Sequence, residues 1–196
     1  MSLTACIIAI GGAVGAGKSS VALLLRDRLA RSLVLEPNSH NSLRLLRSDV
    51  LRKQLLDIDP LSHLPAKYYE NEQYGRLIYN TLHEVARISV DAGDSILLDA
   101  TYARRWQRAA LKAAVRGIPF QGYWLEASLD ERLRRLSIRR NDPSDAGPEV
   151  ASEQHIERPI NEPQWECIDV GGIALDVLTE KLVAHILGNK RNEWSN

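Results

Sequence analysis

The stretch CIIAIGGAVGAGKSS, at residues 6–20, decides the fold of this chain. It opens on a short apolar run, Cys6–Ile10, which predicts a buried strand. Residues 12–19 then match G-x-x-x-x-G-K-S, and Lys18–Leu29 carries apolar side chains at steps of three and four, which predicts a helix. A strand, a glycine-rich loop and a helix in this order predict an anion-binding loop, because backbone N–H groups and the positive end of the helix converge there.

This loop is expected to bind the phosphates of a nucleotide. Lys18 is placed to reach the β- and γ-phosphates, and the hydroxyl of Ser19 is placed to ligate Mg²⁺. The motif specifies nucleotide phosphate and leaves the type of reaction open. The predicted nucleotide-binding residues of the loop are Gly12, Ala13, Val14, Gly15, Ala16, Gly17, Lys18, Ser19 and Ser20.

Length and composition indicate an ordinary single domain over residues 1–196. The 25 Lys and Arg residues balance 25 Asp and Glu residues, which argues against a non-specific nucleic-acid binder. The longest early apolar run, Ala5–Ile10, has six residues, too few for a membrane span or a signal peptide, so we expect a cytoplasmic protein. Cys6 and Cys167 lie in apolar runs and are expected to be buried thiols, with no zinc site.

Short apolar runs alternate with segments of helical period along the rest of the chain, which is typical of an α/β fold with a parallel sheet. The predicted strands are Cys6–Ile10, Leu43–Arg47, Ser95–Asp99, Phe120–Glu126 and Glu166–Val170. The predicted helices include Lys18–Leu29, Tyr68–Val90, Leu129–Arg140 and about Ile173–Leu187. Proline, aspartate and glycine predict loops at Asp57–Ala66 and Asn141–Pro148.

The third predicted strand ends in Asp99, where a carboxylate is expected beside Mg²⁺. Ala100 follows, at the position where many ATPases carry a water-activating glutamate, which argues against a motor or hydrolase. A GTP-dependent switch would need Asn-Lys-x-Asp after a central strand. The Asn-Lys pair at residues 189–190 lies in the tail and continues Arg-Asn, so guanine recognition is not indicated.

Asp49 and Arg52 follow the second predicted strand, one helical turn apart. They are expected to share a face at the carboxyl edge of the sheet, where open α/β sheets bind ligands. A carboxylate there could orient an acceptor hydroxyl and take its proton, and a guanidinium could hold an anionic group of the same acceptor. Alternatively, Asp49 is a plain helix N-cap and Arg52 a solvated surface charge.

Arginines also gather on the helix that is predicted to follow Ser128. Arg132, Arg135 and Arg139 share one face and adjoin the 141–148 loop, which suits a lid that closes over transferring phosphates. The alternative is an exposed arginine-rich helix neutralised by Asp130 and Glu131.

Four motifs together resemble a family of small bacterial P-loop kinases, which is related to phage polynucleotide kinase and, more distantly, to gluconate kinase, the zeta toxins and adenylate kinase. The motifs are the phosphate loop, Ser-Asp-x-x-Arg-Lys at 48–53, Leu-Asp-Ala-Thr at 98–101 and Arg-Arg-x-Asp-Pro-Ser-Asp-Ala at 139–146. The resemblance implies a three-layer P-loop NTPase fold with a five-stranded parallel sheet in order 2-3-1-4-5 and helices on both faces. It also implies a small lid at about 132–148 and a flexible acceptor-side loop at about 57–66.

The resemblance further implies roles for individual residues. Asp49 matches the carboxylate that activates the acceptor, Arg52 the residue that grips acceptor phosphate, and Asp99 a carboxylate that organises this side of the site. The lid arginine is one of Arg135, Arg139 and Arg140, and residues 169–172 border the adenine.

We therefore predict an ATP-dependent phosphotransferase that acts on a hydroxyl of an unidentified small-molecule or nucleic-acid acceptor, with ATP and Mg²⁺ as cofactors. No membrane and no stable protein partner are implied. The alternatives are a 5′-hydroxyl polynucleotide or nucleoside kinase, a zeta-toxin-like sugar-nucleotide kinase, and a non-catalytic ATP-binding regulator. The predicted catalytic residues are Lys18, Asp49, Arg52, Asp99, Arg135 and Arg139; the predicted metal ligands are Ser19 and Asp99; and Arg139 and Arg140 are predicted to bind the nucleotide as well.

Overall fold

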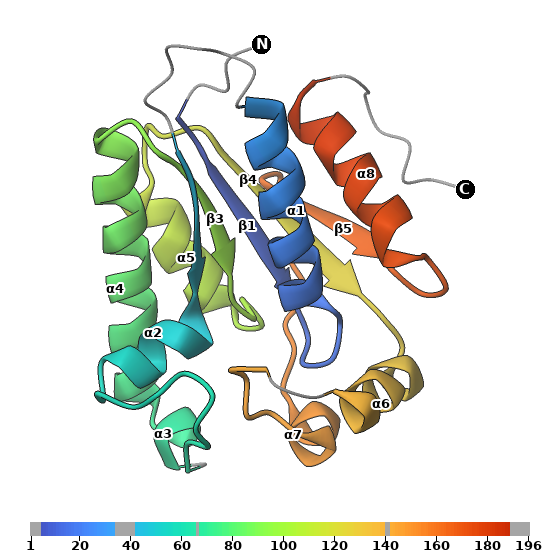
Figure 1. Ribbon diagram of the computed structural model, residues 1–196. Coiled ribbons are helices and arrows are strands. Elements are labelled where there is room, and N and C mark those ends of the chain that lie inside the picture. The colour runs from blue at the N-terminus through green and yellow to red at the C-terminus, as the bar shows by residue number, and fades with distance from the viewer. Residues whose placement is uncertain (1–4, 34–41, 66, 140–141, 189–196) are drawn as a thin grey trace.

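The computed structural model describes residues 5–33, 42–65, 67–139 and 142–188. Its centre is one sheet of five parallel strands in the order β2-β3-β1-β4-β5, as predicted (Figure 1). The strands are β1 (Ile7–Gly12), β2 (Leu43–Arg47), β3 (Ser95–Asp99), β4 (Phe120–Glu126) and β5 (Trp165–Asp169).

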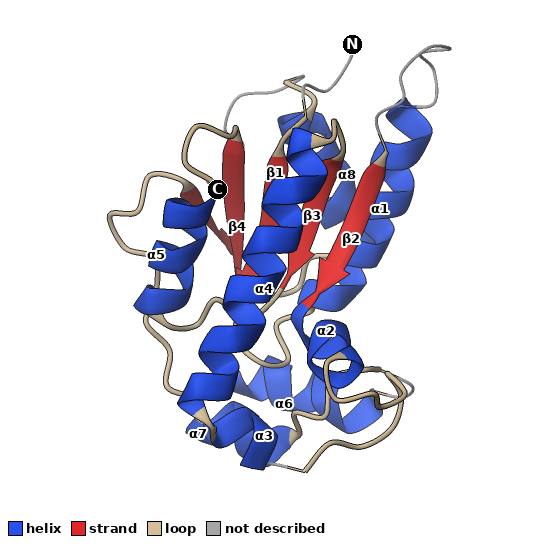
Figure 2. Cartoon of the chain, turned by 90° about the vertical axis from the view of Figure 1, so that its left-hand side faces the viewer, coloured by secondary structure: helices blue, strands red, loops and turns tan. Residues whose placement is uncertain are grey.

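Helices cover both faces of the sheet and give three layers. One face carries α1 (Lys18–Leu33) and α8 (Leu175–Ile186), and the other carries α4 (Glu72–Asp91) and α5 (Arg105–Ala114). Four short helices gather beyond the carboxyl ends of the strands (Figure 2). They are α2 (Ser48–Gln54), α3 (Lys67–Glu70), α6 (Leu129–Ile138) and α7 (Pro148–Glu153).

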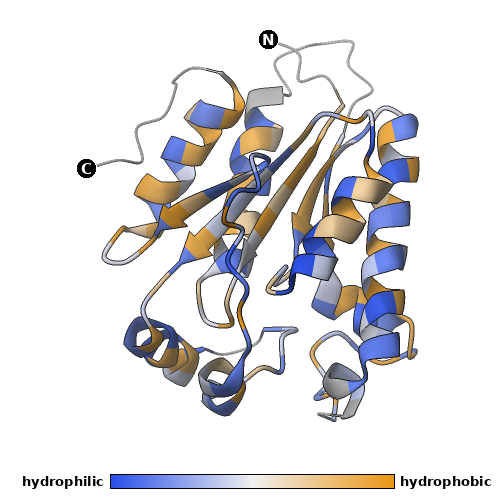
Figure 3. Cartoon of the chain, turned by 180° about the vertical axis from the view of Figure 1, so that it is seen from behind, coloured by the Kyte–Doolittle hydropathy of each residue, from blue (hydrophilic) through white to orange (hydrophobic). Residues whose placement is uncertain are grey.

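The alternation of side chains along β1 explains this layering. Ile7 and Ala9 belong to the cluster under α4 and α5, whereas Ile8 and Ile10 belong to the cluster under α1 and α8. All six residues of β1 are buried, because the strand lies in the middle of the sheet and is covered on both faces. In Figure 3, hydrophobic colour runs along much of the strands.

The predicted boundaries hold for β2, β3 and β4, and β1 runs two residues further, to Gly12. The helix predicted at Tyr68–Val90 is divided into α3 and α4, because the side chain of Asn71 caps α4 by accepting a hydrogen bond from the Tyr74 N–H (2.9 Å). Helices α5 and α7 were not predicted from the sequence.

The expectation of two buried thiols is wrong. Cys6 is partly buried just before β1, and Cys167 is exposed because β5 is an edge strand. In the part of the chain that the structure describes, no cluster of three or more His, Cys, Asp and Glu side chains is arranged as a metal site. Within the same ranges, no helix is both long and apolar enough to cross a bilayer.

Two glycines let an aromatic ring pack directly on the sheet. The indole of Trp165 lies over Gly122 of β4, where an added Cβ would come 2.5 Å from Trp165 Cδ2, and over Gly11 of β1, where it would come 2.8 Å from Trp165 Cζ3. The ring also contacts the rings of Tyr102 and Phe120, with centroids 5.1 Å and 5.9 Å away. The bare backbone therefore provides the space that this cluster needs.

We predict that Gly122→Ala lowers the free energy of unfolding by about 1–3 kcal/mol, because the added methyl group overpacks this contact. Gly75→Ala is the matched control. Nothing lies within 4 Å of a Cβ at Gly75 in helix α4, so this change should raise stability by about 1 kcal/mol through helix propensity. Urea denaturation of both variants checks the two signs, and equal effects would contradict the packing argument.

Candidate active site

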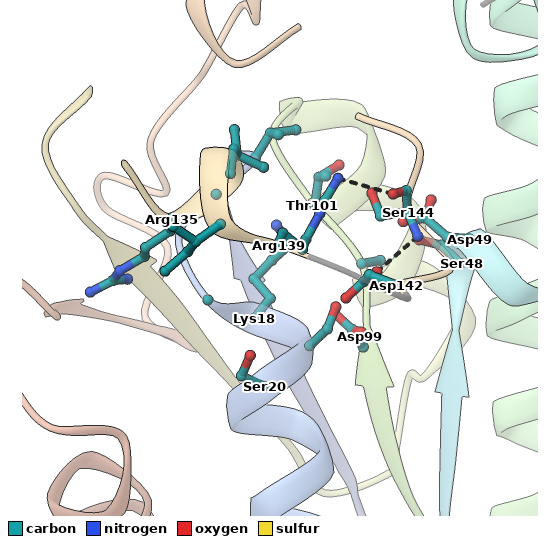
Figure 4. A pocket seen from close by; sticks show the side chains of 17 residues that line it. Lys18, Ser20, Ser48, Asp49, Asp99, Thr101, Arg135, Arg139, Asp142 and Ser144 are labelled. Carbon is teal, nitrogen blue, oxygen red and sulfur yellow. Dashed lines mark hydrogen bonds between the residues drawn. The ribbon is translucent and has the colours of Figure 1, made fainter. Parts of the chain in front are cut away.

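A pocket of about 390 Å³ opens at the carboxyl edge of the sheet, between the loop after β1 and the short helices (Figure 4). Open α/β sheets bind ligands at this edge. The structure brings ten predicted site residues to its wall: Val14, Gly15, Gly17, Lys18, Ser19, Ser20, Asp49, Asp99, Arg135 and Arg139. Gly12, Ala13 and Ala16 belong to the loop but not to the wall, and Arg140 lies outside the described residues.

The phosphate loop, residues 12–19, depends on glycine at two close backbone contacts. Gly12 has φ +140°, and a Cβ there would lie 2.5 Å from the carbonyl oxygen of Leu125. Gly15 has φ +82°, and a Cβ would lie 2.8 Å from the carbonyl oxygen of Arg132. The loop is therefore seated directly on β4 and on α6.

The N-terminus of α1 lies at the loop and is favourable for anions. The helix begins at Lys18, so the N–H groups of its first turn have no carbonyl partner within the helix. Lys18, Ser19 and Ser20 line the pocket at this point. Backbone donors, a lysine and the positive end of a helix at one place fit a chain of phosphate groups.

Lys18 folds back across the loop, and its Nζ donates to the carbonyl oxygen of Ala13 (2.9 Å). Burial lowers the pKa of this ammonium group, while the nearby carboxylates of Asp99 and Asp49 act to raise it. The lysine thus lies between the phosphate loop and the carboxylates on the other side of the pocket, as Figure 4 shows.

Asp99 ends β3, the strand beside β1, and is 5% exposed. Arg47, at the end of β2, donates from Nε to Asp99 Oδ2 (3.0 Å), and its Nη2 lies 3.5 Å from Asp142 Oδ1. The hydroxyl of Ser19 and the carboxylate of Asp99 line the same pocket. Because Mg²⁺ takes oxygen ligands, this pair fits such an ion with a nucleotide phosphate beside it.

Asp49 lies in the first turn of α2, is half-buried and lines the pocket. The N-cap position belongs to Arg47, so the alternative reading of Asp49 as an N-cap is wrong. Burial and the neighbouring charge of Asp99 raise the pKa of Asp49, while Ser144, Arg52 and Lys18 act to lower it.

The structure does not bring Arg52 to the pocket wall. Its guanidinium donates from Nη1 to the carbonyl oxygen of Tyr68 (2.8 Å) and lies 4.7 Å from the centroid of the Tyr69 ring. The side chain is 7% exposed, so it is not a solvated surface charge either. In this arrangement Arg52 acts on Asp49 through its charge, and its role in holding an acceptor stays a prediction.

The arginines of the predicted lid helix differ in burial and in the groups that they contact. Arg134 is exposed and pairs with Glu131, as the alternative of a solvated helix predicts. Arg132 is 7% exposed, and its Nη1 donates to the carbonyl oxygens of Val14 and Ala151 (both 3.2 Å), so it ties the phosphate loop to α7. Glu131 binds Arg134 and Arg135, while Ser128 Oγ accepts from the Glu131 N–H (3.3 Å).

Among the described arginines of this region, Arg135 and Arg139 line the pocket. Arg135 donates from Nη1 to Ala16 O (3.0 Å) and from Nη2 to Val170 O (3.2 Å), and therefore spans from the phosphate loop to the end of β5. Arg139 follows the last residue of α6, and its Nη2 donates to the carbonyl oxygens of Ser144 (3.0 Å) and Ala146 (2.5 Å).

Sequence reasoning missed several groups at this site. Asp142 and Ser144 line the pocket and lie in the 139–146 motif, which pointed to them without giving them roles. Gln154 Oε1 accepts a hydrogen bond from the Val14 N–H (2.8 Å) across 140 residues of sequence, and no local pattern predicts that contact. The contact of Arg47 with Asp99 was also missed, because the sequence shows Arg47 only as the last residue of a strand.

Comparison with known proteins identifies the family. A family model described as an AAA domain, AAA_33, matches residues 7–158. The chain belongs to this family. It is a family of small P-loop kinases, as the sequence motifs predicted.

Solved structures show the same fold at low sequence identity. The chain aligns with the crystal structure of APE1195 with a TM-score of 0.70 and 18% identity, covering 94% of this chain and 96% of that chain. It aligns with the APS kinase CysC of Mycobacterium tuberculosis, in complex with AMPPNP and APS, with a TM-score of 0.62 and 22% identity, covering 94% and 98%. A gluconokinase from Sinorhizobium meliloti 1021 gives a TM-score of 0.61 and 16% identity, covering 96% and 95%. No match was found among curated proteins.

We predict that Asp49→Asn stabilises the protein at neutral pH. The pKa of Asp49 is raised in the fold, so its ionised form opposes folding above that pKa. The advantage of the variant should therefore shrink as the pH falls through the raised pKa and vanish below the ordinary aspartate pKa of about 3.9. Denaturant unfolding between pH 3 and 8 measures this, with Asp57→Asn, which removes an exposed carboxylate outside the pocket wall, as the control variant.

Proposed function

We propose that this protein is an ATP-dependent phosphotransferase that moves the γ-phosphate of ATP to a hydroxyl group of an acceptor. The observation that carries the proposal is the presence of Asp49 in the same pocket as the phosphate loop, on the opposite side of Lys18 from Arg135 (Figure 4). An acceptor hydroxyl beside Asp49 would form the new bond to phosphorus, its proton would pass to the carboxylate, and ADP would leave.

The donor end of the pocket suits ATP. Lys18 and the first turn of α1 would hold the β- and γ-phosphates, and Arg135 and Arg139 would neutralise charge from the side of α6. Ser19 and Asp99 would hold Mg²⁺, which supplies charge compensation to the phosphates when it is bound. Arg47 occupies Asp99 Oδ2 and thereby fixes the orientation of that carboxylate.

Asp49 has the properties of a proton acceptor in such a reaction. Its raised pKa makes the carboxylate a better base than an ordinary aspartate at neutral pH, and its place in a helix on the sheet edge holds it in one position. Lys18 and Arg52 act in the other direction and favour its ionised form. With these opposing effects on its pKa, Asp49 would orient the acceptor hydroxyl and accept its proton late in the transfer.

The residue after Asp99 supports transfer to a hydroxyl over hydrolysis. Ala100 lines the pocket and is 2% exposed, so the position where a carboxylate could activate water holds a methyl group. Asp49 lies across the pocket from the phosphate loop, where we expect the hydroxyl of an acceptor to bind. ATP turnover without an acceptor should therefore be slow.

The distribution of charge favours a neutral or cationic acceptor. Among the described residues that line the pocket, Lys18 and Arg135 lie on the donor side, and Arg139 reaches across to the carbonyl oxygen of Ser144, where its charge is taken up by hydrogen bonds. The acceptor side presents hydroxyls and carboxylates, from Ser48, Asp49, Thr101, Asp142 and Ser144. Because Arg52 does not reach this wall, an anionic acceptor such as a polynucleotide or a sugar nucleotide has less support than a polyol, nucleoside or amino sugar.

We predict that Lys18→Ala abolishes transfer, with a loss of several kcal/mol in transition-state stabilisation, because the γ-phosphate charge is no longer compensated. The test is a radiolabelled-ATP screen over polyols, nucleosides, amino sugars and oligonucleotides with product identification. Lys112→Ala, an exposed lysine on α5, is the control and should keep full activity. Near-native transfer by Lys18→Ala would overturn the donor site, and ATP binding without transfer to any acceptor would favour the regulator alternative.

We predict that Asp49→Asn lowers kcat for transfer by about 10²–10⁴, with little change in ATP affinity, because the variant keeps the shape of the side chain and loses the base. The wild-type rate should fall as the pH drops through a pKa above the ordinary aspartate range. Steady-state kinetics with the acceptor from the screen measures both effects. Brisk ATP hydrolysis without acceptor, unchanged in the variant, would instead indicate an ATPase.

A further inference from the structure

The carboxylate of Asp145 gathers hydrogen bonds from three segments of the acceptor side. Its Oδ2 accepts from the Tyr69 hydroxyl (2.7 Å) and the Leu64 N–H (3.1 Å), and its Oδ1 accepts from Lys53 Nζ (3.2 Å). Burial acts to raise the pKa of Asp145, but the bonds from Tyr69, Lys53 and Leu64 outweigh it and hold the pKa below its usual value. Each of these donors therefore binds the ionised form.

Lys53 completes the connection from the other side. Its side chain is fully buried, and its Nζ also donates to Pro60 O (3.0 Å) and Pro143 O (2.7 Å). An ammonium group has three N–H donors, and here they reach two loops that are more than 80 residues apart in sequence. A lysine is rarely buried to this extent unless its charge is paired.

The loop that Asp145 belongs to also holds the donor-side arginine. Arg139 Nη2 binds the carbonyl oxygens of Ser144 and Ala146, the two residues that flank Asp145. The Ser144 N–H in turn donates to Asp142 Oδ1 (2.8 Å), which lies 3.5 Å from Arg47 Nη2. Residues 142–146 thus join Arg139, at the phosphate side of the pocket, to the acceptor-side segment, residues 57–65.

A second contact leads from the same carboxylate to the proposed base. Tyr69, whose hydroxyl is bound by Asp145, carries the guanidinium of Arg52 on its ring face at 4.7 Å. Arg52 is one of the charges that act on Asp49. The side chain of Asp145 therefore does not line the pocket, yet it binds Lys53 and Tyr69 on the acceptor side, and the residues that flank it bind Arg139 through their carbonyl oxygens.

We propose that Asp145 and Lys53 are positioning residues for the proposed transfer, which couple the placement of Arg139 over the donor phosphates to the ordering of the acceptor-side segment. The inference rests on the proposed function, because it takes the phosphate loop as the nucleotide site. Nucleotide binding at that loop should then order residues 57–65, which are not part of the pocket wall.

Hydrogen exchange with and without a non-hydrolysable ATP analogue and Mg²⁺ tests this coupling. In the wild-type protein, the analogue should slow exchange in residues 12–20, 142–147 and 57–65, and in the last segment by about fivefold or more, the usual size of coupling between two sites. In Lys53→Met/Asp145→Leu, which replaces the ion pair by apolar side chains of similar volume, residues 12–20 should still be protected and residues 57–65 should not respond.

Two further variants keep the test decisive. Asp59→Asn changes an aspartate whose side chain accepts a hydrogen bond from the Leu61 N–H (2.8 Å), a contact within the acceptor-side segment, so the response of residues 57–65 should remain. Tyr69→Phe removes only the hydroxyl bound by Asp145 and should reduce the response even if the double variant fails to fold.

Protection of residues 12–20 without any response at 57–65 in the wild-type protein would overturn the coupling and leave the proposed function standing. An equal response at 57–65 in wild type, the double variant and Tyr69→Phe would overturn it too. If the analogue protects none of these segments in the wild-type protein, the nucleotide site itself is wrong and the inference falls with it.

Discussion

Close backbone packing around the phosphate loop is the constraint on which the rest of the structure depends. At Gly12 the loop meets a carbonyl oxygen of β4, and at Gly15 it meets the backbone of α6, at distances that leave no room for a Cβ. Because these contacts are made by backbone atoms, they fix the position of the loop on the sheet and the position of α6 against the loop. The buried cluster of Val14, Leu136 and Ala151 then extends the same packing to α7. This packing therefore positions the phosphate loop, α6 and α7 together.

The carboxyl edge of the sheet is held by buried charges, in contrast to its apolar interior. Arg47 with Asp99, and Lys53 with Asp145, lie in sites where ions lose most of their hydration. Desolvation of such pairs can exceed their mutual attraction, so they are not obvious sources of stability. Several hydrogen bonds to each partner offset that cost and fix orientation, which an apolar contact cannot do. We interpret these pairs as groups that set geometry around the pocket.

The sequence predicted the parts of the site that depend on local pattern, and missed those that depend on tertiary contacts. The strand, loop and helix around Lys18 follow from adjacent residues, and the resemblance supplied the strand order. Asp49 and Asp99 could be placed because the carboxyl ends of parallel strands meet at one edge. Arg52 could not, because helical spacing puts it beside Asp49 but does not reveal that Tyr68 and Tyr69 turn it away from the pocket. Gln154 and Lys53 act across 140 and 90 residues, respectively.

Under the proposed function, the asymmetry of the pocket would favour transfer over hydrolysis. Lys18 and Arg135 line the side of the phosphate loop, whereas the side around Asp49 presents carboxylates and hydroxyls, with Arg139 bound to the carbonyl oxygen of Ser144. Water is small and has no second contact to make with these groups, whereas a polyhydroxyl acceptor can satisfy several of them at once. An acceptor that does so would fix its own hydroxyl against Asp49, while Ala100 offers water no comparable partner. The preference for transfer over hydrolysis would then depend on which molecules the acceptor side can hold in place. The donor side would bind ATP in the same way for both reactions.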